Sequence, residues 1–313
     1  MGKRVLLTGA GGFVGRQIHK ALAARGAEIT ILARKIRIDH SAKTIVTQDA
    51  FAESREWWAE ACSDIDIVLH AAWYTEPGHY LTSALNLDCL AGTIRLAQGA
   101  ADAGVPRITG VGTCFEYDLS YGDLSVETPL KPETPYAAAK VAAFQALSQW
   151  AAGAGISFLW TRLFFLYGEG EHPRRLVPYL HSRLAAGEQA DLTSGTQIRD
   201  FLDVADAGRM IADAALSDVE GAMNICSGTP VTVREVAERI ADQYGRRDLL
   251  CFGARPNNAV DPPRVVGIPS IPVTRAGDGT EIDKTHAPET GAGAAAPDSA
   301  SDYSHRRRLG ARA

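Results

Sequence analysis

The hydrophobic pattern in the first half of the chain alternates short apolar runs with segments of helical periodicity. Residues 5–7 form an apolar run, and after a glycine-rich turn Ile18 and Leu22 fall on one helical face that ends at Gly26. Residues 27–34 form a second β-rich run. The order strand, turn, helix, strand is that of a βαβ unit, which predicts a parallel sheet.

The same pattern continues along the chain and divides it into regions. Further strands are predicted in residues 43–48, 63–70, 107–113 and 156–163. The expected fold class is α/β, with a doubly wound parallel sheet over residues 1–165 and a returning segment near 200–217. Residues 166–270 are expected to form a smaller α/β cap that binds the substrate. Residues 271–313 contain almost no large apolar side chains, which predicts a disordered tail.

Composition and charge exclude several classes of function. The chain has 313 residues, 46% of them hydrophobic, and a net charge of -5. Because no basic block precedes the last ten residues, nucleic acid is not an expected partner. No apolar run reaches the roughly 18 residues of a membrane span, so no membrane partner is expected. The N-terminal stretch has the pattern of a strand entering a turn and not that of a signal peptide.

The cysteines are odd in number and far apart in the sequence. They match neither a disulfide framework nor a metal-ligand motif, so no metal is expected and a cytoplasmic location is predicted. The five are Cys62, Cys89, Cys114, Cys226 and Cys251.

The first turn of the chain contains glycines at a spacing that suits a dinucleotide. Gly9, Gly12 and Gly15 lie between an apolar strand and a helix. Glycines let the backbone approach a pyrophosphate, and the helix N-terminus offers free N–H groups and a positive dipole end. Ala71 and Ala72, at the end of a later strand, are small enough for a cofactor to pass over them. An incidental glycine turn is the alternative, but the βαβ context favours a cofactor site.

The end of the second predicted strand indicates which cofactor is preferred. Ala33 stands where NAD-binding chains place an acidic residue, and Arg34 follows it. A cation suits a 2′-phosphate, so NADP is favoured and NAD stays open; solvated loop charges are the alternative. Asp49 could accept a hydrogen bond from the adenine amino group or serve as a turn residue. His70 is interpreted as a packed strand-end residue.

A tyrosine and a lysine stand four residues apart in an alanine-rich predicted helix. Tyr136 and Lys140 therefore project from one helical face. The lysine ammonium is expected to pull the pKa of the phenol down from about 10 toward neutrality, which would make it a usable acid and base. Thr113, at the exit of a predicted strand, is the candidate to hold the substrate oxygen beside Tyr136, or else it caps a turn.

Several motifs together resemble the extended short-chain dehydrogenase/reductases, and the sugar-nucleotide branch fits best. They are TGAGGFVG at 8–15, HAA at 70–72, Thr113 with Tyr117 four residues later, YAAAK at 136–140, NLDCLAGT at 86–93, TRLFFLYGEG at 161–170, RLVP at 175–178, RDFLDVAD at 199–206 and GAMNICSG at 221–228. The resemblance covers residue 3 to about residue 267 and implies a Rossmann domain with a substrate cap.

The resemblance also implies roles for individual residues. Tyr136 would be the general acid/base, and Lys140 would bond the nicotinamide ribose and lower the phenol pKa. Arg199 would meet the substrate diphosphate, or else pair with an acid such as Asp200 or Asp203. Together with the residues singled out above, those assigned to the cofactor are Gly9, Gly12, Phe13, Val14, Gly15, Arg34, Asp49, Ala71, Ala72, Tyr136 and Lys140. Those assigned to the substrate are Thr113, Arg175 and Arg199. Arg175 stands near the start of a predicted helix and is a phosphate contact or else a surface charge.

Departures from the family pattern limit the reactions that the chain can catalyse. Cys114 and Phe115 replace the Asp-Glu pair of the 4,6-dehydratases, and Phe115 and Arg175 replace the Cys and His of the 3,5-epimerase/reductases. The favoured reaction is NADPH-dependent reduction of a nucleoside-diphosphate 4-keto-6-deoxyhexose at C4. The alternatives are an NAD-dependent nucleoside-diphosphate-hexose 4-epimerase and, from another class, a non-catalytic NADP sensor or scaffold. A homodimer is expected through Ala91, Leu96, Ala143 and Leu147 of two helices, or else these residues pack against the sheet.

Overall fold

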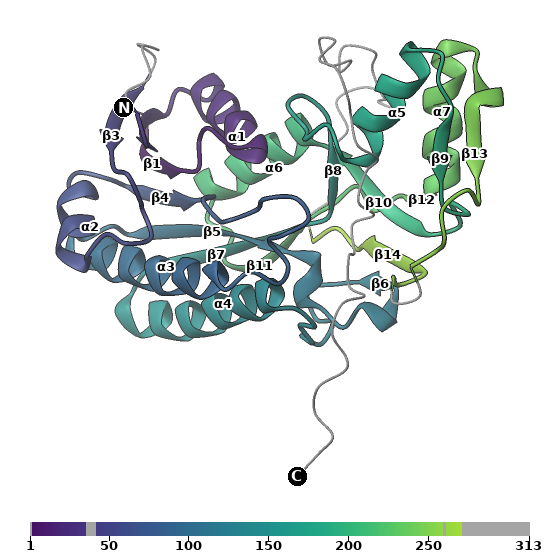
Figure 1. The fold of residues 1–313 in the computed structure, drawn as a ribbon. Coiled ribbons are helices and arrows are strands. Elements are labelled where there is room, and N and C mark those ends of the chain that lie inside the picture. The colour runs from purple at the N-terminus through teal and green to yellow at the C-terminus, as the bar shows by residue number, and fades with distance from the viewer. Residues whose placement is uncertain (1, 36–41, 259–260, 271–313) are drawn as a thin grey trace.

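The computed structural model describes residues 2–35, 42–258 and 261–270 (Figure 1). The predicted tail, residues 271–313, lies outside the described residues. Within them the chain forms one large parallel sheet covered by helices on both faces, and a smaller region of helices and short strands at one end (Figure 1).

The chain begins with the predicted βαβ unit. Strand β1 (Arg4–Thr8) leads through the glycine turn into helix α1 (Phe13–Ala24), and β2 (Glu28–Ala33) follows. Strands β1 and β2 pair in parallel. The turn after α1 includes Gly26 at φ 72°, a left-handed conformation that glycine adopts without a steric penalty.

The main sheet holds seven strands within the described residues, and each neighbouring pair is parallel. Their order is β11-β7-β5-β4-β1-β2-β3. The remaining five are β3 (Lys43–Val46), β4 (Ile67–His70), β5 (Arg107–Thr113), β7 (Ser157–Leu163) and β11 (Gly221–Ile225). The strand order reverses between β1 and β4, and the carboxyl ends of strands at such a point form a crevice where ligands bind.

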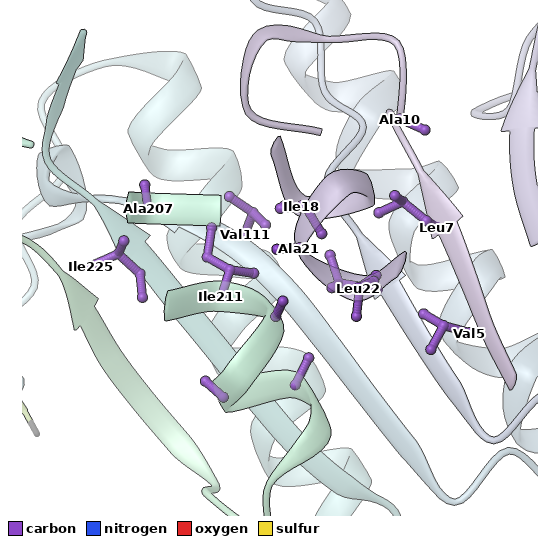
Figure 2. Packing of buried hydrophobic residues seen from close by; sticks show 14 of the residues in the cluster. Val5, Leu7, Ala10, Ile18, Ala21, Leu22, Val111, Ala207, Ile211 and Ile225 are labelled. Carbon is purple, nitrogen blue, oxygen red and sulfur yellow. The ribbon is translucent and has the colours of Figure 1, made fainter. Parts of the chain in front are cut away.

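Helices cover both faces of this sheet (Figure 1). Helices α1 and α6 (Val204–Leu216) pack together on one face, where Ile18 and Ile211 meet Val111 of the sheet (Figure 2). Helices α2 (Arg55–Ala61), α3 (Leu85–Asp102) and α4 (Pro135–Ala154) bury Trp58, Leu96 and Leu147 against the other. Both faces are therefore apolar, as an all-parallel sheet requires.

The smaller region is built mainly from the chain after β7, with the short strand β6 added from an earlier segment. Its sheet has the order β12-β10-β14-β6, with β8 also paired to β10. Those strands are β6 (Asp123–Leu124), β8 (Phe165–Tyr167), β10 (Ile198–Asp203), β12 (Pro230–Thr232) and β14 (Arg264–Gly267). Helices α5 (Leu176–Ala185) and α7 (Val233–Tyr244) share a core with β9 (Ala190–Leu192) and β13 (Leu250–Phe252).

Two features of the fold differ from the sequence prediction. The main sheet has a seventh strand, β11, which pairs with β7 after α6 returns the chain to the sheet. The four residues predicted at a dimer interface are mostly interior: Leu96, Ala143 and Leu147 are buried in the core beneath the helices, and only Ala91 is half-exposed. Their apolar spacing thus reflects packing on the sheet. In the described ranges, no helix has the length and apolar character to cross a membrane.

Candidate active site

The glycine turn is shaped by close approach of backbone segments. Gly9 has φ 74°, and a Cβ there would lie 2.7 Å from the Ala71 carbonyl carbon. A Cβ on Gly15 would lie 2.0 Å from the Gly9 carbonyl oxygen, so α1 packs directly on the turn. A Cβ on Gly12 would meet only that oxygen, at 3.3 Å. Gly12 therefore leaves its outer face open to a ligand, whereas Gly9 and Gly15 are required by the fold.

Helix α1 begins beside this turn, and its first backbone N–H groups are not capped by a side chain in the described part of the chain. Gly12 is its N-cap. Phe13 and Val14 occupy the first two helical positions and pack on the core, so their backbone N–H groups stand at the positive end of the helix. These amides and the open face of Gly12 fit the pyrophosphate of a dinucleotide.

Strand β4 ends next to the turn. His70 is buried, with its Nδ1 2.8 Å from Thr8 Oγ1 and its Nε2 2.9 Å from Thr93 Oγ1. Burial lowers the His70 pKa to about 3, so the ring is neutral, and its interpretation as a packed strand-end residue is confirmed. The Ala72 N–H donates to Thr8 Oγ1 at 3.2 Å, which holds Ala71 and Ala72 over the turn.

The candidate residues for the adenosine half lie at the ends of β2 and β3. Arg34 is exposed directly after β2. Asp49 is exposed too, and its Oδ1 accepts the Phe51 N–H at 2.9 Å. Asp49 is therefore a turn residue in this structure, and its carboxylate still has an oxygen that faces outward.

Tyr136 and Lys140 are presented by the first turns of α4. Thr134 caps the helix by accepting the Ala137 N–H at 3.1 Å, and Tyr136 donates its N–H to the Leu81 carbonyl at 3.1 Å. Lys140 Nζ donates to the Val111 carbonyl oxygen of β5 at 2.5 Å. Both side chains are buried, so neither is a surface residue.

The pKa of Tyr136 shifts in the direction opposite to the sequence prediction. Burial raises it well above 10, while a side-chain hydrogen bond with Thr113 acts to lower it. Burial also lowers the pKa of Lys140 to about 7. The expected lowering of the phenol pKa by Lys140 is therefore wrong for this structure, because removal from water raises the pKa and the nearby Glu116 acts in the same direction.

A buried carboxylate holds the loop that carries Thr113. Glu116 Oε1 accepts the Thr113 N–H at 2.8 Å and the Trp160 Nε1–H at 3.0 Å, and Arg162 Nε donates to Oε2 at 2.7 Å. Glu116 and Arg162 are both fully buried. Sequence reasoning missed this pair. Glu116 stands between Phe115 and Tyr117 in a segment with an apolar pattern, and a charged residue in such a segment could have indicated a buried ion pair.

Two aromatic side chains that sequence reasoning also missed pack on Tyr136 and Lys140. Lys140 Nζ lies 3.7 Å from the centroid of the Trp73 ring, which is a cation–π contact. The Tyr136 ring meets the rings of Trp73 and Tyr80 edge to face, with centroids 6.4 and 4.9 Å away. Trp73 directly follows Ala72, which was predicted to lie at the cofactor. This position in the sequence could have indicated that Trp73 lies at the site.

The two predicted substrate arginines are each paired with an acid. Arg199 is buried and forms an ion pair with Asp261 at 2.7 Å, not with Asp200 or Asp203. Asp200 instead accepts from Ser227, Gly228 and Gly267, and Asp203 caps α6. Arg175, the N-cap of α5, pairs with Glu171 at 3.2 Å. Arg199 therefore pairs with an acid, as one of the two predictions for it stated, but the acid is Asp261, which the sequence did not indicate.

Comparisons with known proteins agree with this arrangement. A family model described as "NAD dependent epimerase/dehydratase family" matches residues 5–226. A dTDP-6-deoxy-L-talose 4-dehydrogenase (NAD(+)) from Aggregatibacter actinomycetemcomitans is 25% identical over 268 residues, which cover 84% of this chain and 98% of that protein. A dTDP-6-deoxy-L-talose 4-dehydrogenase (NAD(P)(+)) from Kitasatospora kifunensis is 29% identical over 257 residues, 77% of this chain and 79% of that protein.

A solved structure matches the fold. UDP-glucose 4-epimerase from Thermus thermophilus, in complex with NAD, superposes with a TM-score of 0.72 at 24% identity and covers 85% of this chain and 90% of that one. The predicted class, an α/β protein with a doubly wound parallel sheet and a smaller C-terminal region, is confirmed.

Proposed function

Because the chain belongs to the NAD dependent epimerase/dehydratase family, and is thereby an NAD(P)-dependent enzyme of sugar-nucleotide modification, we propose that it reduces a nucleoside-diphosphate 4-keto-6-deoxyhexose at C4 with NADPH. The predicted membership of the extended short-chain dehydrogenase/reductases is confirmed. Two relatives are dehydrogenases of dTDP-6-deoxy-L-talose at the 4-position, and such an oxidation read backwards is the proposed reduction.

The observation that supports the reductive direction is the protonated phenol of Tyr136. Because burial raises its pKa well above 10, Tyr136 holds its proton at neutral pH. A 4-keto sugar becomes an alkoxide when it accepts a hydride, and that oxygen must then gain a proton. Tyr136 donates it, and Thr113, at the end of β5, orients the same oxygen.

The chain's own residues would hold the dinucleotide at the strand ends. When bound, the nicotinamide supplies the hydride. Gly9, Gly12 and the first amides of α1 bind the pyrophosphate, and Lys140 bonds the nicotinamide ribose beside Tyr136. The exposed Arg34 pairs with a 2′-phosphate, which favours NADP; Asp49 offers its outward oxygen to the adenine amino group.

The cofactor site makes a testable distinction between two glycines. We expect Gly12→Ala to unfold at nearly the wild-type temperature and to bind NADPH at least ~10-fold more weakly, because its methyl group enters the space for the pyrophosphate. Gly15→Ala is the matched comparison and should melt several degrees lower, since its methyl group would lie 2.0 Å from the Gly9 carbonyl oxygen. Thermal melts and quenching of protein fluorescence by NADPH measure both. Equal NADPH affinity of Gly12→Ala and wild type would contradict the site.

The reaction is tested by incubating the purified protein with NADPH or NADH and a panel of dTDP-, CDP-, GDP- and UDP-4-keto-6-deoxyhexoses. We expect loss of absorbance at the nicotinamide band with stoichiometric product, faster with NADPH than with NADH. Interconversion of an ordinary sugar nucleotide without added cofactor would identify the 4-epimerase instead. Binding of NADPH with no turnover would indicate the sensor or scaffold, a class that the presence of both Tyr136 and Lys140 disfavours.

We also propose that the protein is a homodimer through α3 and α4. The four residues first assigned to this contact are mostly interior. Leu85 and Leu87, which are 46% and 67% exposed at the start of α3, are better placed to meet a second copy.

A further inference from the structure

The loop between β8 and α5, residues 168–175, is tied to two parts of the candidate site. On one side the Glu169 carboxylate accepts from Lys20 Nζ of α1 at 2.6 Å. On the other side Arg174 Nη2 donates to the Pro77 carbonyl at 3.0 Å, in the segment that carries Trp73. The loop therefore links the helix at the proposed pyrophosphate site to the segment that packs on the catalytic pair.

A single carboxylate is buried inside this loop. The Glu171 side chain is only 4% exposed, its Oε2 accepts the Gly168 N–H at 3.4 Å, and its Oε1 lies 3.2 Å from Arg175 Nε. A buried carboxylate is costly unless it is paired. Within the described residues Arg175 is the one charged side chain in an ion pair with Glu171. Burial raises the pKa of Glu171 to about 7 in spite of Arg175.

The other ionisable groups near the loop have different partners. Glu169 faces Lys20, and the His172 ring accepts the backbone N–H of Arg174 at 3.2 Å. From the segment opposite, Tyr80 is the titratable side chain on which the Arg175 charge acts. Glu171 thus differs from Glu169 on the same loop, because the Glu171 side chain is enclosed whereas the Glu169 side chain is 67% exposed.

Arg175 is held in a way that suits recognition of a second anion. Its closest contact with Glu171 uses Nε, and a guanidinium held through Nε can present its two Nη groups to an anion. Its charge acts on the buried Tyr80 phenol, and the Tyr80 ring centroid is 4.9 Å from that of Tyr136. Arg175 is therefore near enough to Tyr80 for its charge to act on that phenol, and its side chain is still 40% exposed.

We propose that Glu171 is a positioning residue: its carboxylate orients Arg175 so that the guanidinium binds the diphosphate of the nucleotide sugar. The inference rests on the proposed function, since it takes the substrate to be a nucleoside diphosphate derivative. It adds a residue that is not among the motifs of the sequence. It also makes substrate binding sensitive to pH near neutrality, because a protonated Glu171 no longer holds Arg175 by charge.

The test measures binding directly and does not depend on turnover. The full-length protein, saturated with NADP⁺, is titrated calorimetrically with thymidine, cytidine, guanosine or uridine diphosphate between about pH 6 and about pH 8. For the nucleotide that wild type binds, we expect Glu171→Leu to weaken binding about tenfold at the higher pH, as expected for loss of one charge-assisted hydrogen bond. Wild-type affinity should fall several-fold toward the lower pH.

Glu171→Gln is the conservative variant, since its amide oxygen still accepts from Arg175 Nε. It should bind within about threefold of wild type at the higher pH, and its affinity should change less between the two pH values than that of wild type, because only the terminal phosphate of the ligand then titrates. In steady-state kinetics, Glu171→Leu and Glu171→Gln should each raise KM and leave kcat nearly unchanged. A pH effect that came from titration of Lys140 would change kcat instead. Glu169→Gln on the same loop is the matched control and should bind like wild type. Thermal melts establish that each variant is folded.

The possible failures are distinguishable. If no nucleoside diphosphate binds to the wild type, the nucleotide-sugar substrate is wrong and this inference falls with it. If one binds equally to wild type and Glu171→Leu, or more tightly to Glu171→Leu, only the positioning role is overturned. If Glu171→Leu does not fold, the positioning role is overturned when the affinity of Glu171→Gln depends on pH in the same way as that of the wild type. In the background of Arg175→Gln, the Glu171→Leu change should have no further effect on affinity.

Discussion

Replacing Tyr136 by phenylalanine is expected to lower kcat by on the order of a hundredfold or more, because the variant keeps the ring but loses the proton donor. The ring contacts with Tyr80 and Trp73 do not involve the hydroxyl group, so the packing survives. Thermal stability and NADPH affinity should therefore stay close to wild type. Steady-state rates, a thermal melt and an NADPH titration measure the three quantities.

Tyr80→Phe is the comparison variant for this experiment. It removes a buried phenolic hydroxyl one ring away from Tyr136 and leaves the proton donor in place. Its loss of rate should be far smaller than that of Tyr136→Phe. A near-normal kcat in Tyr136→Phe would remove the proposed mechanism, and the family fold would stand without it.

Replacing Arg162 by methionine is expected to destabilise the protein by about 3–5 kcal/mol, because the change leaves the fully buried Glu116 carboxylate without its counter-ion. Since Glu116 also accepts the Thr113 N–H, activity should fall in the part of the population that stays folded. Urea denaturation followed by circular dichroism gives the free energy of unfolding. Replacing both partners, Arg162→Met with Glu116→Leu, should recover part of the loss, because no charge then stays buried.

Arg247→Met supplies the control for this prediction. Arg247 pairs with Asp242, but both side chains are about half exposed, at 58% and 49%. Solvent screens such a pair, so the urea midpoint should barely move. Equal urea midpoints for Arg162→Met and Arg247→Met would contradict the view that the Glu116–Arg162 pair contributes more to stability because it is buried.

Local features of the sequence were sufficient for the parts of the site that lie on one element. The glycine spacing from Gly9 to Gly15 predicted a turn whose backbone segments nearly touch, and the structure has that close approach. The four-residue interval between Tyr136 and Lys140 placed both side chains on one side of α4. In each case a short stretch of chain sets the geometry, because helical periodicity and glycine conformation are local properties.

Contacts between distant segments were beyond this kind of reasoning. Arg199 was expected to meet a phosphate or a nearby acid, and it pairs with Asp261, which the fold brings from beyond β13. Leu96, Ala143 and Leu147 have spacing that fits either a partner subunit or the sheet, and only the packing of α3 and α4 shows that they are interior. Sequence spacing gives the face of a helix but not what covers that face.

By itself the sequence determined the order of strands and helices, the position of the glycine turn and the pairing of a tyrosine with a lysine. Only the tertiary structure decided the ionisation of that tyrosine. A neighbouring ammonium should lower the phenol pKa, yet burial under Trp73 and Tyr80 raises it. The reason is that desolvation depends on every segment that excludes water from a group, and the segments around Tyr136 come from several separate parts of the chain.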